Sequence, residues 1–240
     1  MAIVPYKDQD GNKKSQVAQM FNNIAGNYDF LNHFLSAGID IIWRKKAVSL
    51  LAPYKPKVVL DIATGTADFA LETLRLHPDK IIGVDISEGM MAVGREKIAK
   101  KGLSDKIQLQ YGDSENLPFE DNTFDAITVA FGVRNFENLS KGLAEMNRVL
   151  KPGGIAVVLE FSKPRSFPMK HLYQFYFKNI LPLVGKFVSK DNAAYTYLPE
   201  SVQAFPDGQD FISIFEKVGF KKTKWHSLTF GISSIYTGIK

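Results

Sequence analysis

Five short apolar runs, separated by helical patterns, constrain the fold of this chain more than any other feature. They are rich in β-branched residues and lie at 57–62, 80–85, 107–111, 124–130 and 155–160. Continuous hydrophobicity over such short lengths is typical of strands that are buried on both faces of a sheet. The stretches between them include amphipathic patterns at 68–76, 88–100 and 139–150. This alternation predicts an α/β fold with a doubly wound, mostly parallel sheet and right-handed crossovers.

The region before this core is predicted to be helical. Residues 1–14 are polar and form a leader, and residues 15–52 form an N-terminal helical cap. The cap begins with four apolar residues at the spacing of one helix face, Val17, Met20, Phe21 and Ile24. Two prolines, Pro53 and Pro56, then separate the cap from the first strand.

The region after the core carries an insertion. Residues 163–205 follow the fifth strand, and their densest part, 167–188, places aromatic side chains between lysines. The elements predicted to end the chain are a helix at 207–218 and strands at 221–227 and 232–239.

Composition favours one domain. A chain of 240 residues with 45% hydrophobic residues can bury its apolar surface in a single core, and we assign residues 15–240 to one domain with a cofactor-binding core at 57–160. The net charge is +5, but basic and acidic residues are interleaved, which disfavours nucleic acid as a partner. The lack of cysteine excludes disulfides, thiolate metal sites and a cysteine nucleophile. No apolar run approaches the roughly 20 residues that span a bilayer, so we expect a cytoplasmic protein.

The loop after the first strand is suited to the close approach of a ligand. Its small residues, Ala63, Gly65 and Ala67, let the backbone pass near a bound molecule. Thr66 is placed either to cap the next helix or to bond the ligand. Taken alone, the loop is also compatible with a tight strand-to-helix turn that binds nothing.

Acidic residues follow the next two strands. Asp85 ends the second strand, where doubly wound nucleotide-binding folds place an acid that accepts both ribose hydroxyls. Asp113 and Ser114 follow the third strand, where a carboxylate can accept the amino group of an adenine ring. Acids at three successive strand ends therefore predict a nucleoside site.

The predicted ligand is not a dinucleotide. A pyrophosphate site needs the three glycines of G-x-G-x-x-G, whereas Gly65 is the one glycine of this loop, and Asp61 and Asp68 would repel phosphate. S-adenosylmethionine combines a ribose with a positively charged sulfonium and an α-ammonium group, and it lacks phosphate. The loop thus favours S-adenosylmethionine as cofactor over the nicotinamide cofactor of an oxidoreductase.

Six stretches carry a resemblance to a known family. In one-letter code they are FNNIAGNYD at 21–29, DIATGTAD at 61–68, LPFEDNTFD at 117–125, FGVRN at 131–135, RVLKPGG at 148–154 and LEFSKP at 159–164. The chain resembles class I methyltransferases and, within them, the ubiquinone/menaquinone biosynthesis C-methyltransferases, over nearly its whole length from Val17. It departs from that pattern at Ala67, where the family loop usually has glycine, and at Ala130, where some relatives have serine.

The resemblance implies a fold, a cofactor and a reaction. The implied fold is a Rossmann-like, seven-stranded sheet with an antiparallel final strand. The candidate cofactor-binding residues are Thr66, Asp85, Asp113 and Ser114, which carry over from the family, together with Ala63, Gly65 and Ala130. The implied reaction is S-adenosylmethionine-dependent C-methylation of demethylmenaquinol to menaquinol. C-methylation of a benzoquinol precursor of ubiquinone is one alternative, and a non-catalytic nucleoside-binding module is the other.

Methyl transfer from a sulfonium mainly requires that donor and acceptor be aligned. A ring carbon becomes nucleophilic when the neighbouring quinol hydroxyl loses its proton, so the site needs a base or a cation that stabilises the oxyanion. The candidate catalytic residues are Arg134, Asn135, Asp68 and Tyr28. Arg134 either pairs with Asp68 or holds the quinolate, and a purely structural Arg–Asp pair is the alternative. No metal is expected, because the four histidines lack ligand spacing and are expected at the surface or in packing.

The aromatic insertion indicates an apolar partner. It either lines an entry for an isoprenoid tail or rests on a membrane with its lysines toward the headgroups, although a helix packed in the core fits equally well. We therefore expect a prenylated quinol substrate and transient contact with the inner face of a membrane. No nucleic acid is expected, because the turn at 130–134 lacks the Pro-Pro motif of base amine methylation. A homodimer is left open.

Overall fold

The centre of the computed structural model, which describes residues 3–36, 38–180 and 192–240, is a seven-stranded sheet with the order β3-β2-β1-β4-β5-β7-β6. The strands are β1 (Val58–Ile62), β2 (Lys80–Asp85), β3 (Ile107–Tyr111), β4 (Phe124–Ala130), β5 (Leu150–Phe161), β6 (Lys221–Leu228) and β7 (Ser233–Ile239). Strands β1 to β5 are parallel, and β7 is antiparallel to both β5 and β6. The expected doubly wound sheet with an antiparallel end is confirmed.

Strand β5 is longer than the predicted run at 155–160. Leu150 pairs with Phe124, the register then shifts across the Pro-Gly-Gly turn, and Ile155 resumes the pairing opposite Ala126. Within the parallel part of the sheet, the strand order reverses between β1 and β4. Ligands of open α/β sheets bind at such a switch point, outside the carboxyl ends of the strands.

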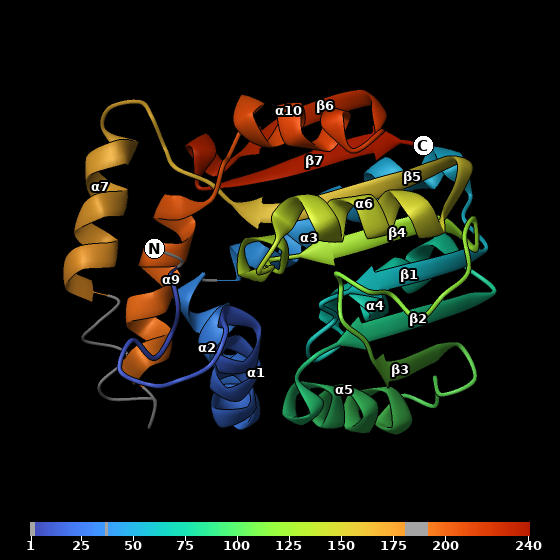
Figure 1. The fold of residues 1–240 in the computed structure, drawn as a ribbon, viewed down its shortest axis with the longest axis horizontal. Helices are drawn as coiled ribbons and strands as arrows, with labels where there is room; N and C mark the ends of the chain where they lie inside the picture. The colour runs from blue at the N-terminus through green and yellow to red at the C-terminus, as the bar shows by residue number, and fades with distance from the viewer. Residues whose placement is uncertain (1–2, 37, 181–191) are drawn as a thin grey trace.

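The helices cover both faces and one end of this sheet (Figure 1). They are α1 (Lys13–Ile24), α2 (Tyr28–Leu35), α3 (Ile39–Leu51), α4 (Asp68–Thr73), α5 (Glu88–Lys100), α6 (Leu139–Val149), α7 (Met169–Phe175), α9 (Asn192–Ala204) and α10 (Gln209–Lys217). Helix α1 begins inside the segment expected as a polar leader, because the side chain of Asn12 accepts the backbone N–H of Ser15 and caps it.

Two hydrophobic cores lie on opposite faces of the sheet. Along β5, Ala156 and Val158 face the core that α6 and α10 cover, while Val157 and Leu159 face the core that α3 and α4 cover. Successive strand side chains point to opposite faces, so a strand buried on both sides must be apolar throughout. This requirement explains the continuous hydrophobic runs of the sequence.

The cap and the insertion meet in a third apolar cluster. Val17 and Met20 of α1 pack with Ala194, Tyr195 and Tyr197 of α9, although these helices are far apart in the chain. Figure 1 shows α1, α2 and α9 together at the end of the sheet toward which β1, β4 and β5 point. The two segments therefore form one layer over the carboxyl ends of the strands. Residues 181–188, the last part of the predicted aromatic stretch, lie outside the described residues.

Candidate active site

A pocket lies at the carboxyl ends of β1 to β4, beneath the cap. We call it the strand-end pocket. Its lining residues include Lys14, Phe21, Tyr28, Ala63, Gly65, Asp85, Ile86, Met90, Asp113, Ser114, Ala130, Phe131, Gly132 and Asn135. Eight of the predicted site residues are therefore brought together here: Tyr28, Ala63, Gly65, Asp85, Asp113, Ser114, Ala130 and Asn135.

The loop after β1 has an unusual backbone. Ala63, Gly65 and Ala67 all have positive φ values, of 52°, 55° and 68°, a region that side chains with a Cβ adopt at a cost. A Cβ on Gly132, in the facing loop after β4, would lie 2.5 Å from the Cβ of Ala63. The two loops therefore approach each other so closely that position 132 requires glycine.

Asp85 organises the end of β2. Its Oδ2 accepts the backbone N–H of Gly65 at 2.8 Å, and its Oδ1 accepts that of Ser87 at 2.8 Å. Burial raises the pKa of this carboxyl, against the lowering effect of these hydrogen bonds. Each carboxylate oxygen keeps acceptor capacity, and Asp85 lines the pocket. Its contact with ligand hydroxyls stays a prediction.

Asp113 is bonded to α1 by Lys14, a residue that no pattern of the sequence singled out. The Nζ of Lys14 lies 2.6 Å from Oδ2 of Asp113, while Oδ1 of Asp113 accepts the N–H of Glu115. The neighbouring Lys13 donates from Nζ to the backbone carbonyls of Arg134 and Phe136. Both lysines fall in the expected leader, where no pattern distinguished them from a solvated surface. These contacts of Lys13 and Lys14 hold α1 over the strand-end pocket.

The predicted acidic loop is not a free patch of negative charge. Asp61 is 1% exposed, and its carboxylate accepts the hydroxyls of Thr64 and Thr128 at 2.6 Å each. Burial raises the pKa of Asp61 to about 6. Asp68 is held in ion pairs by cations. The charge of Asp68 is therefore partly balanced by Arg44 and Lys97, and the stronger case against a dinucleotide is the missing glycines.

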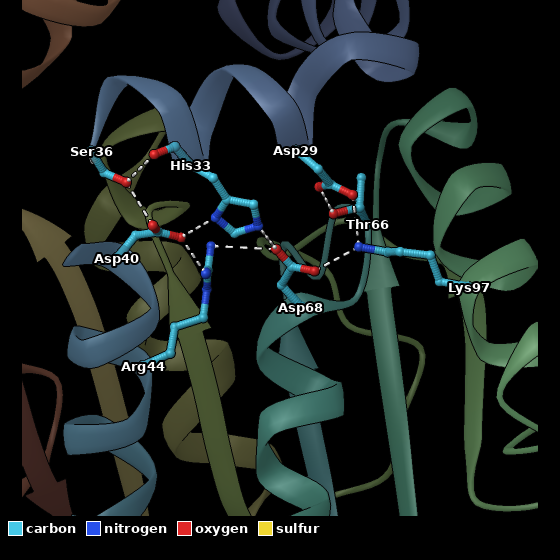
Figure 2. Close-up of polar contacts among 8 residues, drawn as sticks. All are labelled: Asp29, His33, Ser36, Asp40, Arg44, Thr66, Asp68 and Lys97. Atoms are coloured by element: carbon cyan, nitrogen blue, oxygen red, sulfur yellow. Dashed lines mark hydrogen bonds and ion pairs between the residues drawn. The ribbon is translucent and has the colours of Figure 1, made fainter. Parts of the chain in front are cut away.

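Asp68 lies in the polar network of Figure 2, at the start of α4. Its Oδ1 lies 2.6 Å from Nζ of Lys97, and its Oδ2 lies 3.7 Å from Nη2 of Arg44. Lys97 also pairs with Asp29 at 2.8 Å, and Asp29 accepts the hydroxyl of Thr66 at 2.5 Å. This chain of contacts links α2, α3 and α5 to the loop after β1.

The same network includes a buried acid of the cap. The carboxylate of Asp40 accepts hydrogen bonds from Nη1 of Arg44 at 2.5 Å and from the hydroxyl of Ser36 at 2.6 Å. It also lies 2.9 Å from Nδ1 of His33. Burial alone would raise the pKa of Asp40, but its hydrogen bonds with Ser36 and Arg44 hold that pKa below its usual range. His33, expected at the surface or in packing, has a side chain that is 37% exposed and lies between Asp40 and Asp68.

Arg134 does not pair with Asp68, so that alternative is wrong, while its contact with a quinolate stays a prediction. Its Nη1 lies 2.8 Å from Oε1 of Glu160 and donates to the carbonyl of Phe131, and its guanidinium lies 5.4 Å from the ring centroid of Phe161. Glu160 attracts the guanidinium because it is a fully buried carboxylate, whereas Asp68 has two other cationic neighbours, Arg44 and Lys97. The sequence places an acid, Glu160, at the end of the predicted fifth strand, and this acid indicated a second candidate partner for Arg134.

A larger cavity adjoins the strand-end pocket. This aromatic cavity has a volume of about 400 Å³, and its walls come from α1, α2, α3, α7, α9 and the end of β5. Phe21, Tyr28 and Phe131 line both spaces, so the two spaces meet at these side chains. Phe131 stacks on Phe161 with ring centroids 4.6 Å apart. Burial raises the pKa of Tyr28 to about 12, which keeps its hydroxyl protonated.

The remaining predicted residues lie around these spaces. Thr66 and Asp68 line a small side pocket together with Tyr28 and Arg44, while Arg134 lines the aromatic cavity. A site in which a nucleoside-type pocket opens onto an aromatic cavity is arranged to bring a polar cofactor to an apolar acceptor.

Comparison with known proteins agrees with this arrangement. Residues 9–240 match the model of the ubiE/COQ5 methyltransferase family. The chain belongs to this family. A demethylmenaquinone methyltransferase of Bacteroides fragilis is 54% identical over 239 residues, which cover 99% of this chain and 97% of that protein. A ubiquinone/menaquinone biosynthesis C-methyltransferase UbiE of Geobacter sulfurreducens is 48% identical over 230 residues, or 95% of this chain and 90% of that protein.

Solved structures support the fold of this ubiE/COQ5 family member. A SAM-dependent methyltransferase of Thermotoga maritima, described as a possible histamine N-methyltransferase, has a TM-score of 0.66 at 21% identity, covering 92% of this chain and 99% of that one. A protein of Methanococcus maripaludis, described as a putative S-adenosyl-L-methionine-dependent methyltransferase, has a TM-score of 0.60 at 18% identity, covering 98% and 96%. The resemblance to class I methyltransferases is thus confirmed, and the cofactor of this methyltransferase is S-adenosylmethionine.

Proposed function

We propose that this methyltransferase transfers a methyl group from S-adenosylmethionine to a ring carbon of demethylmenaquinol, which yields menaquinol. The observation that carries the proposal is the junction at Phe21, Tyr28 and Phe131, where the strand-end pocket opens onto a cavity of aromatic side chains. The names of the Bacteroides fragilis and Porphyromonas gingivalis relatives, both demethylmenaquinone methyltransferases, support the choice of acceptor.

The strand-end pocket fits the cofactor. Asp85 is placed to accept the ribose hydroxyls, and Asp113 with Ser114 lies one strand further along, on the side proposed for the adenine. The loop residues Ala63, Gly65 and Thr66 line the sheet edge near Ala130. When bound, the cofactor supplies a methyl group attached to a positively charged sulfur. After transfer of the methyl group, this sulfur is part of a neutral thioether.

The residues of the chain then act on the acceptor. The aromatic walls exclude water and hold the quinol ring, while the guanidinium of Arg134 favours loss of the proton from a ring hydroxyl by stabilising the oxyanion. That hydroxyl proton would be released to solvent. Electron density would pass from the oxygen to the adjacent ring carbon, which would bond to the methyl carbon as the bond from that methyl to sulfur breaks. The proton of the ring carbon would then move to the ring oxygen, which restores the aromatic diol. Tyr28 and Asn135 position the ring at the junction, and Asp68 positions Arg44 and Lys97.

We also propose that the chain works in the cytoplasm in contact with the inner face of the membrane. Phe167 and Phe175 are 83% and 59% exposed around α7, and Lys170 is exposed between them. An apolar tip flanked by a lysine suits an anionic lipid surface, which is where a prenylated quinol resides. Within the described residues, none of the helices is both long and apolar enough to cross a membrane.

A reconstituted reaction tests this function. The purified protein is incubated with S-adenosylmethionine that carries an isotope-labelled methyl group, together with anaerobically reduced demethylmenaquinone or the corresponding benzoquinol. We expect one labelled methyl on a ring carbon of the naphthoquinol, identified by mass spectrometry and NMR. Preferential labelling of the benzoquinol would move the assignment to the ubiquinone precursor, and absence of transfer to both would overturn it.

A further inference from the structure

Unpartnered polar atoms gather around the aromatic cavity. Among the described residues, the buried side-chain atoms that lack a hydrogen-bond partner are on Asn32, Arg134, Asn135, Asn147, Tyr173 and Tyr197. Four of these residues line the aromatic cavity, namely Asn32, Arg134, Tyr173 and Tyr197. A buried polar group without a partner is costly and calls for a ligand or a water molecule. The concentration of such groups at one cavity therefore points to a ligand that carries matching polar atoms.

Two of these groups are phenol hydroxyls from the two helices of the insertion. Tyr173 belongs to α7, and Tyr197 belongs to α9 and is only 2% exposed. Both tyrosines line the same cavity as Arg134. The Nε of Arg134 is also unpartnered, although Nη1 is engaged by Glu160.

The chemistry of these groups defines what they can hold. Burial raises the pKa of Tyr197 to about 12 and raises the pKa of Tyr173 as well. Both tyrosines therefore stay protonated at neutral pH and can donate hydrogen bonds. Two phenol donors beside a guanidinium N–H match an oxygen that carries, or gains, negative charge. Most of the other lining residues are aromatic or aliphatic, which suits a hydrocarbon ring and tail.

We propose that Tyr173 and Tyr197 donate hydrogen bonds to a ring oxygen of the quinol acceptor, beside Nε of Arg134, and so select a hydroxylated aromatic ring. This inference rests on the proposed function and adds the residues that recognise the acceptor oxygen. The anchored oxygen fixes the orientation of the ring, and so determines which ring carbon faces the junction with the strand-end pocket.

Binding measurements test the proposal without turnover. A short-tailed prenyl 1,4-naphthalenediol, kept reduced, is titrated into the protein, and the fluorescence of Trp43, which lines the cavity, reports binding. The matched ligand is the same prenylnaphthalene without oxygens. We expect Tyr173→Phe and Tyr197→Phe each to weaken binding of the diol about tenfold, as expected for one lost hydrogen bond, and to leave binding of the hydrocarbon unchanged. Tyr54→Phe, at a surface-exposed tyrosine, is the control.

The two ligands separate recognition from packing. An equal loss of affinity for the diol and the hydrocarbon would overturn the proposal, because it would show that the tyrosines only shape the cavity. Unchanged affinity for the diol in both variants would overturn it as well. Failure of the proposed function would give a different result from failure of this inference. The wild-type protein would then neither bind nor methylate the diol. In turnover, the variants should raise the KM for the quinol and leave the KM for S-adenosylmethionine unchanged.

Discussion

The Nη1 of Arg134 lies 2.8 Å from Oε1 of Glu160, and both side chains are buried, at 7% and 0% exposure. This pair stands where the sequence suggested a contact between Arg134 and Asp68. It turns the guanidinium toward the aromatic cavity and away from the polar network beneath the cap. Glu160 is the penultimate residue of β5, so the guanidinium of Arg134 is anchored to the sheet.

Removing this arginine should affect both stability and turnover. Arg134→Ala leaves the buried Glu160 without its counter-charge, which is expected to cost about 3–5 kcal/mol of unfolding free energy. In Arg134→Ala/Glu160→Gln the buried charge is absent, so part of that stability should return while turnover stays low. Urea unfolding and steady-state kinetics measure the two effects. Full activity of the double variant would remove Arg134 from the catalytic residues.

Asp85 should govern affinity for the cofactor. Asp85→Ala removes the proposed acceptor of the ribose hydroxyls and the two backbone hydrogen bonds that shape the loop. We expect binding of S-adenosylhomocysteine to weaken by about 1–3 kcal/mol in isothermal titration calorimetry. The exposed Asp105 provides a matched control, since Asp105→Ala should leave the affinity intact. If both variants bind equally well, Asp85 does not contact the cofactor.

The buried Asp61 predicts a distinctive pH dependence of stability. Its folded-state pKa is raised from 3.8 to about 6, so between these values the folded protein binds more protons than the unfolded chain. The stabilising contribution of its proton is complete below pH 3.8 and is lost as the pH rises through 6. Asp61→Asn should therefore be more stable than the wild type at pH 7, by about 1–3 kcal/mol.

The comparison between pH 4 and pH 7 isolates this effect. The difference in unfolding free energy between Asp61→Asn and the wild type should grow as the pH rises, because other groups titrate alike in both proteins. A difference that stays constant from pH 4 to pH 7 would show that Asp61 titrates normally in the folded state. Urea unfolding at each pH provides the measurement.

The exposed phenylalanines next to and within α7 should bind lipid. Each phenylalanine that enters a membrane contributes about 1.5–3 kcal/mol, so Phe167→Ser/Phe175→Ser should lower partitioning onto anionic vesicles by at least about tenfold. Vesicle sedimentation measures this, with Tyr54→Ser as an exposed aromatic control on another surface. The double variant should turn over a short-tailed quinol normally. Equal sedimentation of the wild type and the double variant would contradict membrane contact through this tip.

The fold could be predicted from the sequence because its pattern is local. A strand that is buried on both faces must be apolar throughout, so runs such as 124–130 predict both the strand and its place inside the sheet. The place of Asp85 and Asp113 in the strand-end pocket was likewise predictable, because parallel strands bring their carboxyl ends to a common edge. Their place follows from topology and does not depend on side-chain geometry.

The polar contacts of the cap could not be predicted, because they join residues that are distant in the chain. Lys14 meets Asp113, and Lys97 meets Asp29, only after α1 and α2 fold over the strand ends. The partner of Arg134 was predicted wrongly for the same reason. Spacing in the sequence does not show that the buried Glu160 lies closer to Arg134 than Asp68 does.

The most direct measurement is a crystal structure of the protein with S-adenosylhomocysteine and a prenyl 1,4-naphthalenediol. We expect the ribose hydroxyls on Asp85, the adenine beside Asp113 and Ser114, and the diol ring in the aromatic cavity, facing the cofactor sulfur across the junction at Phe131. A nucleoside bound away from Asp85 and Asp113, or a diol outside the aromatic cavity, would contradict the proposed methyl transfer.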